Sequence, residues 1–582
     1  MQGMEQRNLV IFIALAIAIL LGSQYLLPHP QRPVQTAQQV EQSKAASGAP
    51  AGPDAASGLQ LPNAATEAAA TETRDQVLGE TARVAIDTPR MSGSINLKGA
   101  RFDDLTLKDY RETVDPKSPA IVLLSPSGAP NAYRASQGWI AKDPAVKVPT
   151  DDTVWQATGG TLAPGKPVTL TWDNEAGLTF KREISVDDNF LFTVKDSVSN
   201  AGSAPVALFP YGSVARTGEP SASSTWVSYE GPIGGYTSGA EELSYKDVAA
   251  DKTQPKETVG GWLGFSDKYW LAAVAPDQKT AITARFTHSG TAETQTYQAD
   301  YLGAETDVAP GASIDNDGVV FAGAKEVKLL DHYTKNAGLP NFDRAVDFGW
   351  FYFLTKPIFY LLDWLYGVVG NFGIAILMLT VVIKGLFFPL ANKAFKNMDK
   401  MKQLQPQMAK LKEQNGDDKV KLQQETMALY KRMGVNPVAG CLPMLLQIPV
   451  FFSLYKVLYV TIEMRHAPFF GWIHDLSAPD PTTLFNLFGL IPWTPPLFLM
   501  IGVWPVIYCI TMILQQRMQP TPPDPTQAKM MQFMPFVFTF MLGKFPAGLM
   551  IYYSWNNILT VCQQTLIRRR GAAAAARAAA RA

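Results

Sequence analysis

A single lysine interrupts an apolar run in the C-terminal half of this 582-residue sequence. Residues 372–383 carry no charge, Lys384 follows them, and residues 385–390 are apolar again. A lone ammonium at membrane depth costs roughly 2.5–3.5 kcal/mol on insertion scales, so it normally faces a partner or a water-filled cavity. We therefore interpret Lys384 as a functional cation within a membrane-spanning helix.

Few other polar residues lie in the apolar runs of this half. They are Thr380, Gln447, Thr511, Tyr552, Tyr553, Asn556 and Asn557. They form neither a charge relay nor a metal-binding set, and no acidic residue stands at mid-span beside Lys384. Proton- and ion-coupled transporters usually need such a carboxylate together with inverted repeats. A channel or transporter is therefore the weaker alternative.

Another apolar run, residues 528–542, is rich in methionine and phenylalanine. It contains Met530, Met531, Met534 and Met541 with Phe533, Phe536, Phe538 and Phe540. Flexible thioethers suit a surface that accepts many different apolar partners, although Met more often fills gaps in a helix bundle. The sequence leaves both interpretations open.

A basic segment follows the span that contains Lys384. Apolar residues recur there at helical spacing in two groups: Met398, Met401, Leu404, Met408 and Leu411, then Leu422, Thr426, Leu429 and Met433. Residues 415–418 supply a turn and an N-cap between the groups. Residues 391–433 carry ten basic side chains, among them Lys400, Lys402, Lys410 and Lys412, against five acidic ones. We expect a helical hairpin outside the membrane, which is a solvated basic face, a docking surface, or both.

Charge and cysteine content divide the chain into two halves. Residues 28–345 contain 28 Lys and Arg against 39 Asp and Glu, whereas residues 346–582 contain 22 against 11. The three cysteines, Cys441, Cys509 and Cys562, all lie in the second half. No disulfide can therefore stabilise the acidic half, which must depend on its hydrophobic core.

The N-terminal residues predict an anchor and a linker. Residues 8–27 form an apolar run of roughly 20 residues, long enough to cross a bilayer. We favour an uncleaved anchor over a signal peptide because no A-x-A site follows the run closely. Residues 28–70 are rich in Pro, Ala, Gln, Gly and Ser, a composition typical of a flexible linker.

The acidic half predicts an all-β domain of the sandwich type. Period-two alternation marks residues 168–172, 178–186, 190–194, 281–286 and 296–301 as strands, with a turn at Asp187, Asp188 and Asn189. We see no catalytic constellation, because His288 stands alone and carboxylates such as Glu219 fall in apparent turns. A binding or scaffolding module is favoured. A carbohydrate-binding or epimerase domain, with paired acid and base groups in a deep pocket, is the alternative.

The remaining segments complete a protein with six membrane spans. Aromatic residues between 342 and 370 predict an amphipathic helix in the membrane interface, broken by Pro357 and Gly370. Apolar runs follow at residues 441–462, 496–514, 528–542 and 547–567. Under the positive-inside rule the basic segments lie in the cytoplasm, which places both termini there and the β domain on the opposite side.

The order of these elements and a set of motifs resemble the YidC/Oxa/Alb family of membrane protein insertases, in its Gram-negative form with a large periplasmic domain. The motifs are KGLFFPL (384–390), KMKQLQP (400–406), GDDK (416–419), MALYK (427–431), VNP (435–437), GCLP (440–443), QIP (447–449), EMRHAPF (463–469), WIHDLS (472–477), FMP (533–535) and FPAGL (545–549). They cover about residues 346–567 and are highly specific. The β domain matches by position and fold class more than by motif.

The resemblance implies five core helices around a hydrophilic groove that is open to the cytoplasm and to lipid. The groove residues would be Lys384, Thr380, Gln447, Tyr552 and Tyr553. Lys384 departs from the family's Arg, which keeps the charge but loses the forked donors. Met530, Met534, Phe533 and Phe536 would form a slide for the substrate's helix. The β domain would resemble a galactose-mutarotase supersandwich without its enzymatic activity.

The resemblance also implies a function and partners. The chain would move short hydrophilic segments of nascent inner-membrane proteins through the groove, release their helices laterally into lipid, and assist folding and assembly. It would act in the bacterial inner membrane, alone or with the Sec translocon (SecYEG and SecDF). The ribosome and targeting factors would contact the basic hairpin and tail. The chain would not be an enzyme and would need no cofactor, metal or DNA.

The sequence thus predicts a multi-pass α-helical membrane protein with a large all-β periplasmic supersandwich domain. Its segments are a transmembrane anchor (1–27), a linker (28–75), the β domain (76–340), an interfacial helix (341–370), transmembrane helix 2 (371–390), the cytoplasmic hairpin (391–436), transmembrane helix 3 (440–465), a periplasmic loop (466–495), transmembrane helix 4 (496–516), a cytoplasmic loop (517–527), transmembrane helices 5 (528–544) and 6 (546–567), and a basic cytoplasmic tail (568–582).

Overall fold

The structure is a computed structural model, and the part of the chain that it describes begins at residue 72. It describes residues 72–220, 228–290, 295–415, 418–434, 442–489, 491, 493, 495–496, 500–519 and 525–579. The expected anchor, residues 1–27, and almost all of the expected linker lie outside the described residues.

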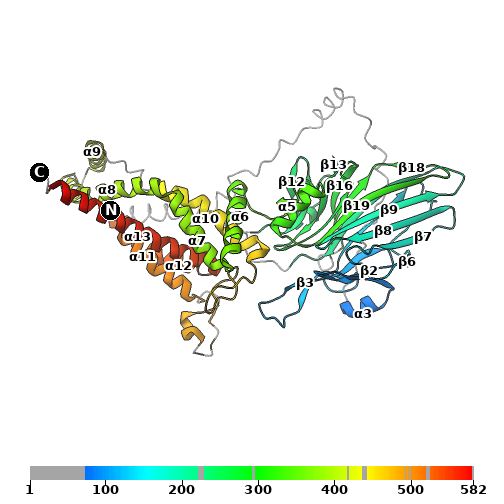
Figure 1. The fold of residues 1–582 in the computed structure, drawn as a ribbon. Coiled ribbons are helices and arrows are strands. Elements are labelled where there is room, and N and C mark those ends of the chain that lie inside the picture. The colour runs from blue at the N-terminus through cyan, green and yellow to red at the C-terminus, as the bar shows by residue number, and fades with distance from the viewer. Residues whose placement is uncertain are drawn as a thin grey trace, which may run out of the picture. The chain divides into compact units, whose positions relative to one another are not determined.

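The first half of the described chain forms two large antiparallel sheets (Figure 1). One sheet has the order β1 (Arg83–Asp87), β2 (Met91–Asn96), β3 (Arg101–Arg111), β5 (Tyr133–Ala141), β10 (Val206–Thr217), β17 (Thr296–Gly303), β16 (Ala281–Ser289) and β13 (Lys256–Val259), with β4 (Ala120–Leu124) on β3 and β18 (Thr306–Val308) on β10. The other has the order β12 (Gly239–Glu242), β11 (Gly231–Tyr236), β14 (Trp262–Ser266), β15 (Trp270–Pro276), β19 (Ser313–Ala324), β9 (Leu191–Asn200), β8 (Leu178–Val186), β7 (Val168–Asp173) and β6 (Gln156–Thr158).

Side chains from the two sheets share one hydrophobic core. Alternate residues of β8 are buried, as expected of a strand with one face in a core. The rings of Phe102 in β3 and Phe192 in β9 lie with their centroids 5.1 Å apart, and the Tyr133 hydroxyl of β5 donates to the carbonyl of Phe265 in β14. The sheets therefore pack face to face, and the prediction of an all-β sandwich is confirmed.

The strands expected from period-two alternation are present as β7, β8, β9, β16 and β17. The expected turn between β8 and β9 is held by Asp187, whose carboxylate accepts from the backbone N–H groups of Asn189 and Leu191. Arg182 occupies an inward position of β8 and forms a buried ion pair with Asp196 of β9 at 2.6 Å. The register of the two strands places these residues directly opposite each other.

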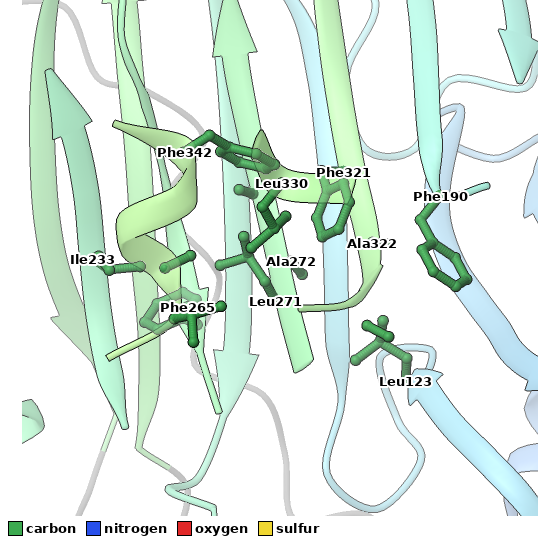
Figure 2. Packing of buried hydrophobic residues seen from close by; sticks show 14 of the residues in the cluster. Leu123, Phe190, Ile233, Phe265, Leu271, Ala272, Phe321, Ala322, Leu330 and Phe342 are labelled. Carbon is green, nitrogen blue, oxygen red and sulfur yellow. The ribbon is translucent and has the colours of Figure 1, made fainter. Parts of the chain in front are cut away.

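Short helices cover parts of the sheets. They are α3 (Arg74–Gly79), α4 (Tyr245–Ala249), α5 (Val327–Asn336) and the 3-10 helix η2 (Phe342–Ala345). Figure 2 shows Leu330 of α5 and Phe342 of η2 beside Phe321 of β19. The Phe342 and Phe321 rings are 5.1 Å apart and nearly perpendicular, an edge-to-face geometry that aromatic pairs favour. The sheet with β19 is thus covered on this side by apolar contacts.

The second half of the described chain is helical (Figure 1). Its elements are α6 (Tyr352–Val369), α7 (Phe372–Leu386), α8 (Phe388–Asn415), α9 (Lys419–Arg432), α10 (Leu442–Val460), the 3-10 helices η4 (Ile462–Met464) and η5 (Leu484–Gly489), α11 (Val503–Arg517), α12 (Pro525–Leu542) and α13 (Ala547–Ala579).

The prediction that Pro357 breaks the aromatic helix is wrong. Pro357 lies inside α6, which continues to Val369. Proline removes one backbone donor from a helix. Pro357 is the sixth residue of α6 and lies next to the first turn, where the N–H groups have no helical partner, so few hydrogen bonds of the helix are lost. Gly370 does end α6, in the left-handed conformation with φ 68°, as expected of a glycine at a helix C-terminus.

The chain bends between α7 and α8. The Asn371 side chain caps α7 by accepting from the Ile374 N–H, and α7 ends at Leu386, before the end at 390 that we expected. The two helices meet at 69°. Pro389 explains the early end, because it has no N–H to donate to the Gly385 carbonyl and its ring would clash with that carbonyl in a continuous helix. The second helix then begins at Phe388 with Pro389 in its first turn, where proline is tolerated.

By length and hydropathy, none of the described helices qualifies alone as a bilayer span. The bent pair of α7 with α8 as far as Leu411 qualifies together, and shorter apolar helices run over Gln447–Val460 and Ala528–Leu542. The number of six spans therefore stays a prediction. Helix α11 begins at Val503, later than the expected 496, and α13 continues beyond the expected end at 567 as far as Ala579.

Candidate functional site

Lys384 lies in the last turn of α7 and is half-buried. Its ammonium donates to the hydroxyl of Thr560 in α13 at 2.7 Å. Within the described part of the chain, no carboxylate lies at ion-pair distance from this ammonium. The negative end of the α7 macrodipole stabilises a cation at this place without neutralising its charge.

Thr560 belongs to a row of buried polar side chains along α13. The row advances by four residues at a time: Tyr552, Asn556, Thr560 and Gln564. This spacing places all four on one face of the helix. Tyr552 and Asn556 are among the polar residues that stand out in the sequence, whereas Thr560 and Gln564 were not predicted. The same four-residue step in the sequence is a signal that could have found them.

The other expected groove residues contact different partners. Gln447 of α10 donates to the Tyr552 hydroxyl, so this pair joins α10 to α13. The half-buried Tyr553 ring lies 5.3 Å from the Phe451 ring and is part of an aromatic cluster. The hydroxyl of Thr380 donates to the Ile376 carbonyl within α7. The structure therefore brings Lys384 and Gln447 against α13, which carries Tyr552. The hydroxyl of Thr380 is instead hydrogen-bonded within its own helix, α7.

Two further contacts connect α13 to its neighbours. The Trp555 indole N–H donates to the Leu377 carbonyl of α7 at 3.2 Å. Asn557 donates to the Thr511 hydroxyl of α11 at 3.3 Å. Both contacts fix the orientation of α13 relative to the helices beside it, so the polar row has a defined direction.

The expected slide residues lie on α12 and differ in exposure. Phe533 is 64% exposed and Phe536 is exposed as well, whereas Met530 and Met534 are half-buried. Further exposed apolar residues are Val537, Phe540 and Met541. Val537 and Phe540 lie four residues after Phe533 and Phe536, and Met541 lies four residues after Val537, so these side chains form one apolar face. Such a face can contact either lipid tails or a substrate helix.

The expected hairpin contains the helices α8 and α9. Leu404 and Met408 of α8 and Leu429 of α9 are buried, and the Tyr430 hydroxyl donates to the Met408 sulfur at 3.4 Å. Burial raises the pKa of Tyr430. The Asp418 carboxylate caps α9 by accepting from the N–H groups of Val420 and Lys421, as the sequence predicted.

The basic side chains of the hairpin face outward to different degrees. Lys400 and Lys410 are exposed and Lys402 is half-buried, while the structure describes only the backbone of Lys412. The sequence did not predict an ion pair near the middle of α8, where Arg568 of α13 pairs with Asp399 at 2.8 Å. This pair attaches the first helix of the hairpin to the helix that carries Thr560.

The chemistry available here is electrostatic. Among the described residues, no three His, Cys, Asp or Glu side chains are grouped so that they could hold a metal ion. An ammonium has three donors, and Thr560 uses one of them. The other two can donate to an anion such as a substrate carboxylate. The arrangement can therefore bind and release an acidic segment without covalent chemistry.

Comparisons with known proteins identify the family. Residues 83–361 match the model of the YidC periplasmic domain, and residues 364–574 match the model of the 60Kd inner membrane protein. The membrane protein insertase YidC of Rhizobium meliloti (strain 1021) is 51% identical over 571 residues, which cover 97% of this chain and 96% of the relative. The chain belongs to the YidC family of membrane protein insertases. The predicted family is thereby confirmed.

Other YidC proteins are similar over the same extent. That of Rhizobium etli (strain CIAT 652) is 52% identical over 573 residues, with 97% of this chain and 96% of the relative covered. That of Methylobacterium sp. (strain 4-46) is 49% identical over 599 residues, with 98% and 96% covered. Since YidC proteins are insertases, the prediction that the chain is not an enzyme is also confirmed.

Solved structures resemble the chain less closely. A crystal structure described as an active YidC insertase, with its first transmembrane domain resolved, has a TM-score of 0.34 and 16% identity over 82% of this chain and 91% of that one. A galactose mutarotase related enzyme from Lactobacillus acidophilus has a TM-score of 0.30 and 11% identity, covering 41% of this chain and 97% of its own. At these scores the assignment to the YidC family depends on the sequence matches alone.

Proposed function

We propose that this chain inserts nascent inner-membrane proteins by moving their short hydrophilic segments through a positively charged groove that is open to the cytoplasm. The substrate's apolar helix then leaves sideways into lipid, and the chain also assists folding and assembly. It acts alone or beside the Sec translocon. The observation that carries this proposal is the ammonium of Lys384, which among the described residues has a hydroxyl partner and no carboxylate.

The positive charge of Lys384 gives the groove a preference for acidic segments. Two opposite unit charges about 4 Å apart attract each other by roughly 4 kcal/mol at an effective dielectric constant of 20, but by only about 1 kcal/mol in bulk water. An acidic segment that approaches Lys384 through a partly desolvated site therefore gains more than it would in water. The buried polar row from Tyr552 to Gln564 supplies hydrogen-bonding groups where lipid would offer none.

The apolar face of α12 serves as the slide in this mechanism. Phe533 and Phe536 present exposed rings, and the thioethers of Met530 and Met534 lie partly buried beside them. Thioether side chains are flexible and polarisable, so they adapt to helices of different shape. Transfer of the substrate's apolar helix from this face to lipid is then driven by hydrophobic partition and the membrane potential.

The basic elements set the orientation and the cytoplasmic contacts. The lysines of the hairpin and Arg568, Arg569 and Arg570 of α13 belong in the cytoplasm under the positive-inside rule, which also puts both chain termini there. The ribosome and targeting factors bind at these basic surfaces, and the β domain lies in the periplasm.

The experiment reverses the charge at the centre of the site. We expect Lys384→Glu to reduce insertion of a substrate with an acidic translocated tail by about tenfold or more, because attraction becomes repulsion. The same substrate with its tail acids replaced by amides should lose much less. Protease protection in proteoliposomes measures both.

Lys544→Glu is the matched control, since Lys544 is exposed between α12 and α13 and belongs to no proposed site. It should leave insertion of both substrates within about twofold of the unmodified chain, because a solvated surface charge interacts weakly with a distant segment. An equal loss for both substrates in Lys384→Glu would mean that Lys384 is only structural.

A further inference from the structure

The hydroxyl that contacts Lys384 is itself held in one direction. Thr560 is 4% exposed, and its Oγ1 donates to the Asn556 carbonyl one turn earlier at 2.7 Å. A hydroxyl has one proton and two lone pairs, so after this donation Thr560 can only accept. A threonine in a helix that makes this bond to residue i−4 also has a defined χ1 angle. The lone pairs of Thr560 therefore point to a fixed place, which the Lys384 ammonium occupies at 2.7 Å.

A hydroxyl holds a cation differently from a carboxylate. Lys356 in α6 lies between the carboxylates of Asp331 and Asp343, each at 2.6 Å, and these two charges more than offset its own. Thr560 orients the Lys384 ammonium by a charge-assisted hydrogen bond but leaves its full charge for an incoming anion. Among the described contacts, it also leaves two of the three N–H donors of Lys384 unused.

We propose that Thr560 is a positioning residue for insertion: its hydroxyl fixes the ammonium of Lys384 against α13 so that the remaining two donors receive the acidic side chain of a substrate segment. The inference rests on the proposed function, because it assigns a role to Thr560 only through Lys384. It predicts that Thr560 matters for acidic segments and has little effect on uncharged ones.

The chain offers closely matched variants for a test. Thr560→Val removes the hydroxyl at nearly constant shape, and Thr560→Ser restores a hydroxyl at the same position. Thr565→Val is the control, since the Thr565 hydroxyl of the same helix donates to the Val561 carbonyl at 2.8 Å and the described contacts of Lys384 do not include it. The full chain, reconstituted in proteoliposomes, is given the acidic-tail substrate and its amide counterpart, as for Lys384→Glu.

Thr560→Val should lower insertion of the acidic-tail substrate by about tenfold, the effect of losing one hydrogen bond to a charged group, and change the amide substrate by less than about twofold. Thr560→Ser should recover most of the loss. Thr565→Val should match the unmodified chain with both substrates. Adding Thr560→Val to Lys384→Ala should cause no further loss, because the hydroxyl then has no ammonium to position.

Three other results would overturn the inference, and they are distinguishable. If Lys384→Ala impairs acidic tails while Thr560→Val behaves like Thr565→Val, Thr560 does not position the cation, although the proposed function stands. If Lys384→Ala leaves acidic tails unaffected, the proposed function fails together with the inference. A loss in Thr560→Val that is equal for both substrates and adds to that of Lys384→Ala would show a purely structural role, and the unfolding temperature in detergent would then fall in parallel.

Discussion

Two lysines of this chain, one in each half, donate to a single hydroxyl but have different surroundings. Lys325 follows β19 and donates to the Ser266 hydroxyl at 2.9 Å, whereas Lys384 donates to Thr560 at 2.7 Å. Four acidic residues attract Lys325 electrostatically: Asp267, Asp347, Glu230 and Glu242. No carboxylate lies at ion-pair distance from either ammonium in the described part of the chain, and no described acidic residue acts electrostatically on Lys384. The β domain thus offsets part of the cost of its buried Lys325 charge internally, whereas no described acidic residue does so for Lys384.

The pair of Arg182 and Asp196 shows the same internal balance in the β domain. Both side chains are almost fully buried, and the guanidinium also donates to the Gln137 carbonyl at 2.6 Å. A charge that is paired and hydrogen-bonded in this way has no capacity left for a ligand. Buried charge thus serves the fold in the β domain, whereas in the function that we propose it serves the substrate in the helices.

The comparison is tested most strongly at Asp196. Asp196→Ala leaves the Arg182 guanidinium buried without a counter-charge, and we expect a loss of about 3–5 kcal/mol in the free energy of unfolding of the β domain. Urea denaturation of the full chain in detergent, followed by tryptophan fluorescence, measures it. The double variant Arg182→Met with Asp196→Leu should lie close to the unmodified chain, because two apolar side chains replace both charges. A loss below about 1 kcal/mol in Asp196→Ala would show that water reaches the guanidinium.

Lys325 gives a second, pH-dependent test. The side chain is 2% exposed, and burial lowers its pKa to about 8. Between about pH 8 and the ordinary lysine pKa of 10.5, the folded state therefore binds fewer protons than the unfolded state, so the free energy of unfolding rises with pH. Below about pH 8 Lys325 is charged in both states, and the full cost of burying its charge lowers the stability.

Lys325→Met removes this cost. At pH 7 we expect the free energy of unfolding of the variant to exceed that of the unmodified chain by up to about 3 kcal/mol, reduced by the contribution of the lost hydrogen bond to Ser266. The variant should therefore unfold at a higher urea concentration. The difference should shrink as pH rises from about 8 to 10.5. Paired denaturation curves at pH 7 and pH 10 measure it, and a difference that does not depend on pH would contradict the assignment of charge burial as its cause.

The smallest effect is expected at the ion pair that attaches α8 to α13. The side chains of Arg568 and Asp399 are 33% and 29% exposed, so the pair is solvated and screened by salt. Asp399→Asn should lower the free energy of unfolding by less than about 1 kcal/mol. Faster hydrogen exchange in α8 around Asp399, with no change in the β domain, should accompany it. Exchange that is equal to that of the unmodified chain would mean that the pair does not hold α8 in place.

The sequence predicted the strands well because one face of each is in the core. The run 178–186 alternates apolar and polar residues, and this alternation is the direct result of one buried face. Arg182 is the exception, since it stands at an inward position where the pattern expects an apolar side chain. Its partner Asp196 could not be predicted, because the pairing depends on the exact register across the turn at Asp187.

In the helices, the sequence identified residue types better than partners. Lys384 was conspicuous as a charge in an apolar run, yet its contact with Thr560 spans 176 positions and depends on how α7 and α13 pack. Threonine is common in helices as a residue bonded to its own backbone, so composition alone does not single out Thr560. Pro357 misled the prediction because a proline near the first turn costs much less than one in mid-helix.

The length of α13 has a mechanical consequence. Its 33 residues form one helix from Ala547 to Ala579, roughly 50 Å long, whereas the hydrocarbon core of a bilayer is about 30 Å thick. The arginines at 568–570 and the hydroxyl of Thr560 therefore belong to the same rod, separated by about two to three turns of helix. A displacement or rotation imposed on the arginine end is transmitted to the Lys384 contact without an intervening joint, so the helix couples whatever holds its basic end to the position of the Lys384 ammonium.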